Sequence, residues 1–214
     1  MIGDKLKYHI AYKAITTYVI SELQAKLNPK NRICISVGGE SGCGKTSLAY
    51  ALLKDIEDTT GLKGVFFHQD DYFKLPPADN NNARMNDINA TGPNEVELEL
   101  LNTHLKQFKE NNGILNKPLI DYHANKILNE QIVCSDFNFC VVEGTYVSTL
   151  NASEYKIFIE STYIDTRKSR IERGRDLINE FNENILEIEH QIIKPHSKLA
   201  NIVIDKNLNI LTKH

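Results

Sequence analysis

Residues 38–47 read Gly-Gly-Glu-Ser-Gly-Cys-Gly-Lys-Thr-Ser, and this stretch decides the fold. It matches the phosphate-binding pattern G-x-x-x-x-G-K-[ST] through Gly39, Gly44, Lys45 and Thr46. Residues 32–37, just before it, form a short apolar run rich in β-branched side chains, and residues 46–54 carry apolar side chains at helical spacing. Because the pattern requires a strand, a glycine-rich loop and a helix in this order, we predict a loop that holds the phosphates of a nucleotide.

The residue types in the loop explain how it would bind an anion. Glycines allow backbone conformations in which consecutive N–H groups point at one phosphate, and the following helix adds its positive dipole end. We expect Lys45 to reach the outer phosphates and the hydroxyl of Thr46 to bind Mg²⁺. The predicted nucleotide contacts are Gly39, Glu40, Ser41, Gly42, Cys43, Gly44, Lys45, Thr46 and Ser47.

Composition and charge favour one globular domain. The chain has 214 residues, of which 41% are hydrophobic and 25% charged, so it can bury a sizeable core. A net charge of −3 gives no sign of a nucleic-acid partner, and no apolar run approaches the length of a membrane span. The four cysteines form no C-x-x-C pair, and residues 1–5 lack the apolar core of a signal peptide. These features predict reduced thiols in a cytoplasmic protein.

Strands that alternate with helices predict a single α/β domain over residues 1–214. Buried strands are expected at residues 32–37, 64–69, 137–142, 155–159 and 201–205, and an edge strand in the tail to residue 211. A two-stranded β-hairpin excursion is expected over residues 117–133, with its turn near residues 123–125. The predicted fold is the three-layer sandwich of P-loop nucleoside triphosphate hydrolases, a parallel sheet with helices on both faces.

Three further segments are predicted from their patterns. Residues 1–28 contain an amphipathic helix from residue 4 to 27, with an inner face of Leu6, Ile10, Ala14, Tyr18 and Leu23. Residues 74–93 are rich in Pro, Asn and Asp without an apolar period, which predicts a long loop on the acceptor side. A helix is expected from residue 94 to about 111, with an inner side of Val96, Leu100, Leu101 and Leu105.

Acidic side chains follow two of the predicted strands. Asp70 and Asp71 come after the second strand, and Glu143 comes after the strand at 137–142. The carboxyl ends of parallel strands meet at one sheet edge, where ligands bind. Phosphoryl transfer needs Mg²⁺ and a group that orients or deprotonates the attacking oxygen. These carboxylates are therefore candidates for both roles, and solvated strand ends are the alternative.

Arginines gather in residues 165–178, the predicted lid. They are Arg167, Arg170, Arg173 and Arg175. Guanidinium groups bind phosphate in a fork and can stabilise the group in transfer. An exposed helix of alternating charge is the alternative, because Glu172 and Asp176 are interleaved.

The order of motifs from about residue 32 to 205 resembles the uridine kinase and phosphoribulokinase family of P-loop small-molecule kinases. Residues 69–73, Gln-Asp-Asp-Tyr-Phe, are similar to the family's Gln-Asp-Ser-Phe-Tyr, and residues 143–145, Glu-Gly-Thr, to its Glu-Gly-Ile. Residues 117–122 resemble its Pro-x-Tyr-Asp-Phe segment beside the acceptor, and residues 165–175 its arginine lid.

The resemblance implies roles for particular residues. Asp70 is the implied catalytic base, and Lys45, Arg167 and Arg173 are implied to steady the transferred group. Mg²⁺ is implied to lie at Thr46 and Glu143, with Asp70 nearby. The implied substrate contacts are Asp71, Tyr72, Asp121, Tyr122, His123 and Arg175.

The acceptor side departs from the family pattern. The family's Asn-Phe-Asp-His-Pro is Asn-Ala-Thr-Gly-Pro at residues 89–93, so Thr91 stands where an aspartate binds the ribose. Ile120 replaces the tyrosine of Tyr-Asp, and the base-contacting histidine falls at Asn125, with His123 near. The phosphate machinery is therefore intact while the nucleoside pocket is altered.

These observations predict a kinase that uses ATP and Mg²⁺ to phosphorylate a hydroxyl of a small metabolite, such as uridine or cytidine. Pantothenate, a ribosyl-nicotinamide or a sugar phosphate remain alternative acceptors. A nucleotide-binding regulator and a kinase-like protein without activity are further alternatives. A GTPase is disfavoured, because residues 116–119 and 125–128 both fail the Asn-Lys-x-Asp pattern. Nucleic acid and membrane partners are not expected, and a homo-oligomer is left open.

Overall fold

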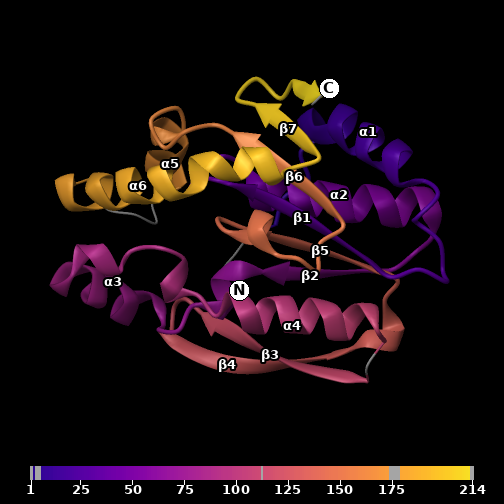
Figure 1. Cartoon of the computed structure of the whole chain (residues 1–214), viewed down its shortest axis with the longest axis horizontal. Coiled ribbons are helices and arrows are strands. Elements are labelled where there is room, and N and C mark those ends of the chain that lie inside the picture. Colours follow the sequence, from indigo (N-terminus) through magenta and orange to yellow (C-terminus); the bar gives the residue numbers. More distant parts are fainter. Residues whose placement is uncertain (1, 3–5, 112, 174–178, 213–214) are drawn as a thin grey trace.

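A six-stranded sheet forms the centre of the computed structural model, which describes residues 2, 6–111, 113–173 and 179–212 (Figure 1). The strand order is β2-β5-β1-β6-β7-β8. The first five of these strands are parallel, and β8 pairs antiparallel with β7 at the edge. The strands are β1 (Ile33–Gly39), β2 (Gly64–His68), β5 (Phe139–Gly144), β6 (Tyr155–Glu160), β7 (Ile202–Asp205) and β8 (Ile210–Thr212). The predicted parallel sheet is thereby confirmed.

Helices cover both faces of this sheet, with α1 (Lys13–Leu23) and α2 (Lys45–Thr60) on one face and α4 (Leu98–Lys109) on the other (Figure 1). Every residue of β1 and β5 is buried, as expected for central strands packed on both faces. Alternate residues of β5 divide between the two cores. Val141 packs with α1 and α2, and Val142 packs with α4.

The predicted hairpin is present as β3 (Ile114–Asp121) and β4 (Lys126–Val133), on the far side of α4 from the sheet (Figure 1). Leu115 and Ile132 join the apolar cluster around α4. The turn between the strands is built on Asp121, whose carboxylate accepts hydrogen bonds from the backbone N–H groups of His123 and Ala124.

Three further α-helices and seven short 3-10 turns complete the described elements. The remaining helices are α3 (Pro77–Asn86), α5 (Arg167–Arg173) and α6 (Glu180–Ile193). The 3-10 turns are η1 (Ile10–Tyr12), η2 (Gln69–Tyr72), η3 (Ile88–Ala90), η4 (Pro93–Glu95), η5 (Cys134–Asp136), η6 (Val147–Thr149) and η7 (Lys194–Leu199). Within the described ranges, no helix combines the length and apolarity needed to cross a bilayer.

The predicted inner face of the N-terminal helix is wrong. The α-helix begins only at Lys13, and it buries Ile15, Thr16, Val19 and Leu23. Ile10, expected on the inner face, lies in η1 and is 74% exposed. The later start changes which residues share the inward face, and only Leu23 is common to the predicted and observed sets. Residues 4 and 5 of the predicted helix lie outside the described residues.

The long loop predicted at residues 74–93 is also wrong, because it contains α3 (Pro77–Asn86) and η3. Pro77 suits the first turn of a helix, and Arg84 in the last turn suits its negative end. None of the described residues of α3 is buried. The apolar period that normally reveals a helix is therefore missing from the sequence.

The helix predicted from residue 94 is shorter than expected at its start. Residues 93–95 form η4, Val96 makes an isolated bridge to Phe73, and α4 begins at Leu98. His104 is buried on the inner side of α4, whereas Leu100 is 40% exposed. Val96, Leu101 and Leu105 of the predicted inner side are buried, so Leu100 is the member of that set that the structure contradicts.

Candidate active site

The carboxyl edge of the sheet brings the phosphate loop and the acidic segments together. In the parallel register, Gly38 of β1 pairs with Gly144 of β5, and Glu143 is flanked by Val37 of β1 and His68 of β2. The turn η2, which carries Asp70, starts directly after His68. The two strand ends therefore place their carboxylates beside the loop at residues 39–45, as the sequence predicts.

The loop has the backbone geometry of an anion-binding turn. Gly44 caps the N-terminus of α2 with φ of 97°, a left-handed conformation that glycine adopts easily. A Cβ atom at this position would lie 2.5 Å from the Tyr12 hydroxyl oxygen. The Nζ of Lys45 donates a hydrogen bond of 2.9 Å to the carbonyl oxygen of Glu40, which holds the ammonium at the loop.

Glu143 is buried at the end of β5 and is held in its charged form. Its Oε1 lies 2.9 Å from Nδ1 of His68. Burial by itself raises the pKa of Glu143, but hydrogen bonds from His68 and Thr46 and the charge of Lys45 outweigh it and lower the pKa. His68 was missed by the sequence analysis, although its register partner, Glu143, was a predicted site residue.

The carboxyl group of Asp70 is shifted in the opposite direction. Burial and the neighbouring charge of Glu143 raise the pKa of Asp70, and the charge of Lys45 offsets this only in part. A pair of carboxylates whose pKa values are pushed apart is suited to two different chemical roles. Asp70 is suited to gain a proton, and Glu143 to remain an anion.

The oxygens at this edge fit a magnesium ion. The Thr46 side chain is close enough to Glu143 to help lower the pKa of this carboxyl group, so two of the three predicted metal ligands lie together. Mg²⁺ is commonly held by one or two protein oxygens, with substrate phosphates and water as its other ligands. Among the described residues, no group of three or more His, Cys, Asp or Glu side chains could hold a metal ion by itself. Thr46 and Glu143 thus fit a metal that arrives with a nucleotide.

Asp71 and Tyr72, predicted to touch the substrate, have partners inside the protein. Asp71 is fully buried, and its carboxylate accepts hydrogen bonds from Nζ of Lys117 at 3.0 Å and from the backbone of Ile120 at 2.9 Å. The Tyr72 hydroxyl lies 2.9 Å from Nδ1 of His104. Both residues therefore fix the turn that carries Asp70 against the hairpin and α4.

The other predicted substrate residues of the hairpin, Asp121, Tyr122 and His123, lie at or next to its turn. The side chain of Asn125 in the same turn accepts a hydrogen bond from the backbone of Ala78 at the start of α3. The hairpin turn and α3 thus lie side by side, and contact of these residues with a substrate remains a prediction.

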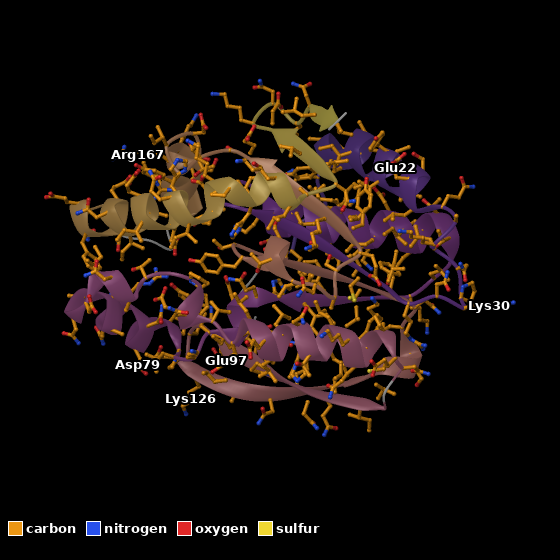
Figure 2. The ribbon with its side chains drawn as sticks, viewed as in Figure 1. Glu22, Lys30, Asp79, Glu97, Lys126 and Arg167 are labelled. Atoms are coloured by element: carbon orange, nitrogen blue, oxygen red, sulfur yellow. The ribbon has the colours of Figure 1, made fainter. Side chains whose placement is uncertain are left out.

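The predicted arginine lid divides into residues with different surroundings. Arg167 has an exposed side chain at the start of α5, across α6 from Asp79 of α3 (Figure 2), and its Nε lies 3.8 Å from Glu183. Arg170 is only 1% exposed and donates to the carbonyl of Tyr163 and to Glu183. Arg173 ends α5. Arg175 lies outside the described residues, as does the whole predicted lid after Arg173.

A cavity of about 420 Å³ adjoins α3, η3, η4 and α6, in the segment predicted to face the acceptor. Its lining includes Lys74, Asn80, Asn89, Thr91, Glu95 and Ile192. The hydroxyl of Thr91 is buried and has no hydrogen-bond partner among the described residues. Thr91, the predicted departure from the family pattern, thus belongs to the wall of this cavity.

An ion network that the sequence analysis missed joins the two sides of this cavity. Arg84 of α3 donates to both oxygens of Glu95, at 2.6 and 2.8 Å, and to Glu189 of α6 at 3.0 Å. Burial, followed by the charge of Glu95, raises the pKa of Glu189, while Arg84 and Lys45 lower it in part.

The sheet order, the glycine loop and the acidic strand ends together define a P-loop protein of the phosphoryl-transfer class. A profile of the Phosphoribulokinase / Uridine kinase family matches residues 34–206, which is most of the sequence. The chain therefore belongs to the phosphoribulokinase / uridine kinase family of P-loop kinases, a family that implies ATP use.

Relatives of this chain carry names that specify different acceptors. The chain is 29% identical over 190 residues to a uridine kinase of Ureaplasma parvum serovar 3. The aligned region covers 83% of this chain and 90% of that protein. It is 26% identical over 194 residues to a bifunctional alpha-galactosidase/sucrose kinase of Mediterraneibacter gnavus. The aligned region covers 84% of this chain and 21% of that protein.

A solved structure supports the fold alone. Phosphoribulokinase from Rhodobacter spheroides superposes with a TM-score of 0.65 at 17% identity, over 82% of this chain and 70% of that one. At this identity the likeness concerns the arrangement of strands and helices and carries no statement on the substrate.

Proposed function

We propose that this protein transfers the γ-phosphoryl group of ATP to a hydroxyl of a small metabolite, and that a nucleoside such as uridine or cytidine is the acceptor. One observation carries the proposal. Two carboxylates, the buried Glu143 and the half-buried Asp70, lie at the sheet edge beside Lys45, and their pKa values are shifted in opposite directions. Phosphoryl transfer from a nucleotide uses a proton acceptor and a permanently charged carboxylate in this way.

The backbone N–H groups of the loop and Lys45 would hold the phosphates of ATP. Thr46 and Glu143 would hold Mg²⁺, which neutralises charge on the phosphates when bound. Asp70 would orient the acceptor hydroxyl and accept its proton, because its raised pKa makes it a better base than an ordinary aspartate. Arg167 and Arg173 are proposed to approach the transferred group from α5.

Thr91 supports a second set of candidate acceptors. Its hydroxyl stands in the cavity wall where the family resemblance expects an aspartate that binds ribose. A neutral hydroxyl binds a diol less strongly than a carboxylate does. Pantothenate, a ribosyl-nicotinamide and a sugar phosphate, as well as sucrose in view of the relative above, therefore belong in any test beside uridine and cytidine.

The test is ADP release from Mg·ATP with each of these acceptors in turn. We expect stimulation by uridine or cytidine in the wild-type chain and none in the Lys45→Ala variant. Stimulation by another acceptor alone would replace the nucleoside assignment and keep the kinase. A wild-type chain that binds Mg·ATP but is stimulated by no acceptor would favour a nucleotide-binding regulator.

A further inference from the structure

Three successive residues of the phosphate loop, residues 40–42, lie against α6 and against the segment of residues 163–170. The carbonyl oxygen of Ser41 accepts a hydrogen bond of 2.9 Å from the Thr166 hydroxyl. At Gly42, where φ is 79°, a Cβ atom would lie 2.7 Å from Cγ of Arg170. The third residue, Glu40, makes the most specific contacts, and in Figure 1 α5 and α6 lie next to each other.

Glu40 is a buried acid in a loop that is built to bind anions. One of its oxygens accepts a hydrogen bond of 2.7 Å from the backbone N–H of Tyr163. The other lies 2.7 Å from Nδ1 of His190 on α6. Its carbonyl oxygen, in turn, accepts the hydrogen bond from Lys45. The position of Glu40 thus affects both the charge near the loop and the placement of Lys45.

The negative charge of Glu40 matters because the proposed ligand of this loop, the phosphates of ATP, is also negatively charged. A carboxylate free to turn toward bound phosphates would repel them, in a site where charges interact more strongly than in water. Two hydrogen bonds from the lid side hold the Glu40 carboxylate and satisfy both of its oxygens. The tether therefore removes a repulsion that the loop sequence would otherwise create.

We propose that His190 is a positioning residue for nucleotide binding: together with the Tyr163 backbone it holds the Glu40 carboxylate toward the lid, away from the phosphates. Docking of α6 on the loop is then part of the nucleotide site, and its loss weakens binding through the freed charge of Glu40. This inference rests on the proposed binding of Mg·ATP at the loop.

The experiment measures Mg·ATP binding to the full chain by calorimetry, without any acceptor. His190→Ala removes the hydrogen bond to Glu40 and should weaken binding by about tenfold, in the range typical of a hydrogen bond to a charged group. His190→Asn keeps a side-chain N–H near the place of Nδ1 and should bind nearly as the wild type does. Gln191→Ala, a neighbouring exposed position on α6, is the matched control and should bind unchanged.

The deciding variant carries a second change, Glu40→Gln, in the His190→Ala chain. Because the neutral amide cannot repel phosphate, the double variant should recover most of the affinity, and the deficit of His190→Ala alone should shrink as salt is added. If His190 had a purely structural role, His190→Ala would lower the affinity for Mg·ATP equally with and without the Glu40→Gln change, and the double variant would not recover affinity. Thermal unfolding of each variant checks that the fold is kept.

The outcomes separate this inference from the proposed function. A wild-type chain that binds Mg·ATP together with a His190→Ala chain that binds equally well would overturn the inference alone. The inference would also be overturned if His190→Ala lowered the affinity for Mg·ATP by the same factor in the wild-type chain and in the Glu40→Gln variant. A wild-type chain that binds no Mg·ATP would overturn the proposed function, and the inference with it.

Discussion

The proposed nucleotide edge and the proposed acceptor side of this chain hold their polar groups in different ways. At the nucleotide edge, Glu143 lies at the end of β5 and Asp70 lies in the turn directly after β2, so a sheet that is packed on both faces fixes where they stand. On the acceptor side, α3 has no buried residue among those described, and Arg84 attaches it to Glu95 and Glu189 through charges. The proposed phosphate chemistry therefore rests on the sheet, whereas the proposed acceptor contacts rest on elements that ion pairs attach to the surface.

The largest expected effect lies at the nucleotide edge. Lys45→Ala should lower kcat by at least about 10³-fold, because it removes the cation expected at the outer phosphates, where charge develops during transfer. ADP release with the best acceptor is the measurement. Lys54→Ala is the matched control, since Lys54 lies on the same helix and its ammonium pairs with Glu57. Equal activity of Lys45→Ala and the wild type would contradict the role of the loop.

The corresponding change on the acceptor side is Arg84→Met. It leaves Glu95 and Glu189 facing each other without their cation, which should lower the free energy of unfolding by about 3 kcal/mol, as for other broken buried pairs. Urea unfolding measures this loss, and KM values show where it acts. We expect KM for the acceptor to rise and KM for ATP to change little. Asn82→Ala, an exposed change on the same helix, should alter neither.

If Arg84→Met instead raised KM for ATP alone, the division between the two regions would be wrong. Arg84→Lys sharpens the comparison. A lysine cannot donate to both oxygens of Glu95 and to Glu189 in one planar arrangement, so it should recover only part of the lost stability.

A smaller effect is expected outside both regions, at Asp55 of α2. This buried carboxylate accepts hydrogen bonds from Lys13, Thr16 and Tyr8 and so fixes the N-terminal segment on the core. Burial alone raises the pKa of Asp55, but these hydrogen bonds outweigh it and lower the pKa. Asp55→Asn should therefore lower the free energy of unfolding by about 2 kcal/mol at pH 7.

The sign of the pH dependence follows from the lowered pKa. The stabilisation by Asp55 is present above the pKa of the unfolded chain, about 3.9, and is lost as the pH falls through the lower pKa of the folded chain. The difference in urea midpoint between wild type and Asp55→Asn should thus shrink between pH 5 and about pH 3. A difference that stays constant over this range would show that the charge of Asp55 is not involved.

The same contrast explains what could be predicted from the sequence. The loop and the strand ends were predicted correctly, because buried parallel strands read as apolar runs and glycine patterns are local. The helix α3 was not predicted, because it buries no apolar face. The roles of three further residues depend on side-chain partners that are 75 to 150 residues away in the sequence, and no local pattern reveals such partners. These residues are His68, Glu40 and Glu189. The buried Arg170 was grouped with the lid for the same reason.

The central claim is that Asp70 is the base of a phosphoryl transfer at the loop, and the Asp70→Asn variant tests it most directly. Mg·ATP binding and acceptor-dependent ADP release are measured on the same preparation. We predict that Mg·ATP binding stays within about twofold of wild type while turnover falls by about 10²- to 10⁴-fold, the usual contribution of a general base. An Asp70→Asn chain that binds Mg·ATP and turns over at the wild-type rate would contradict the account.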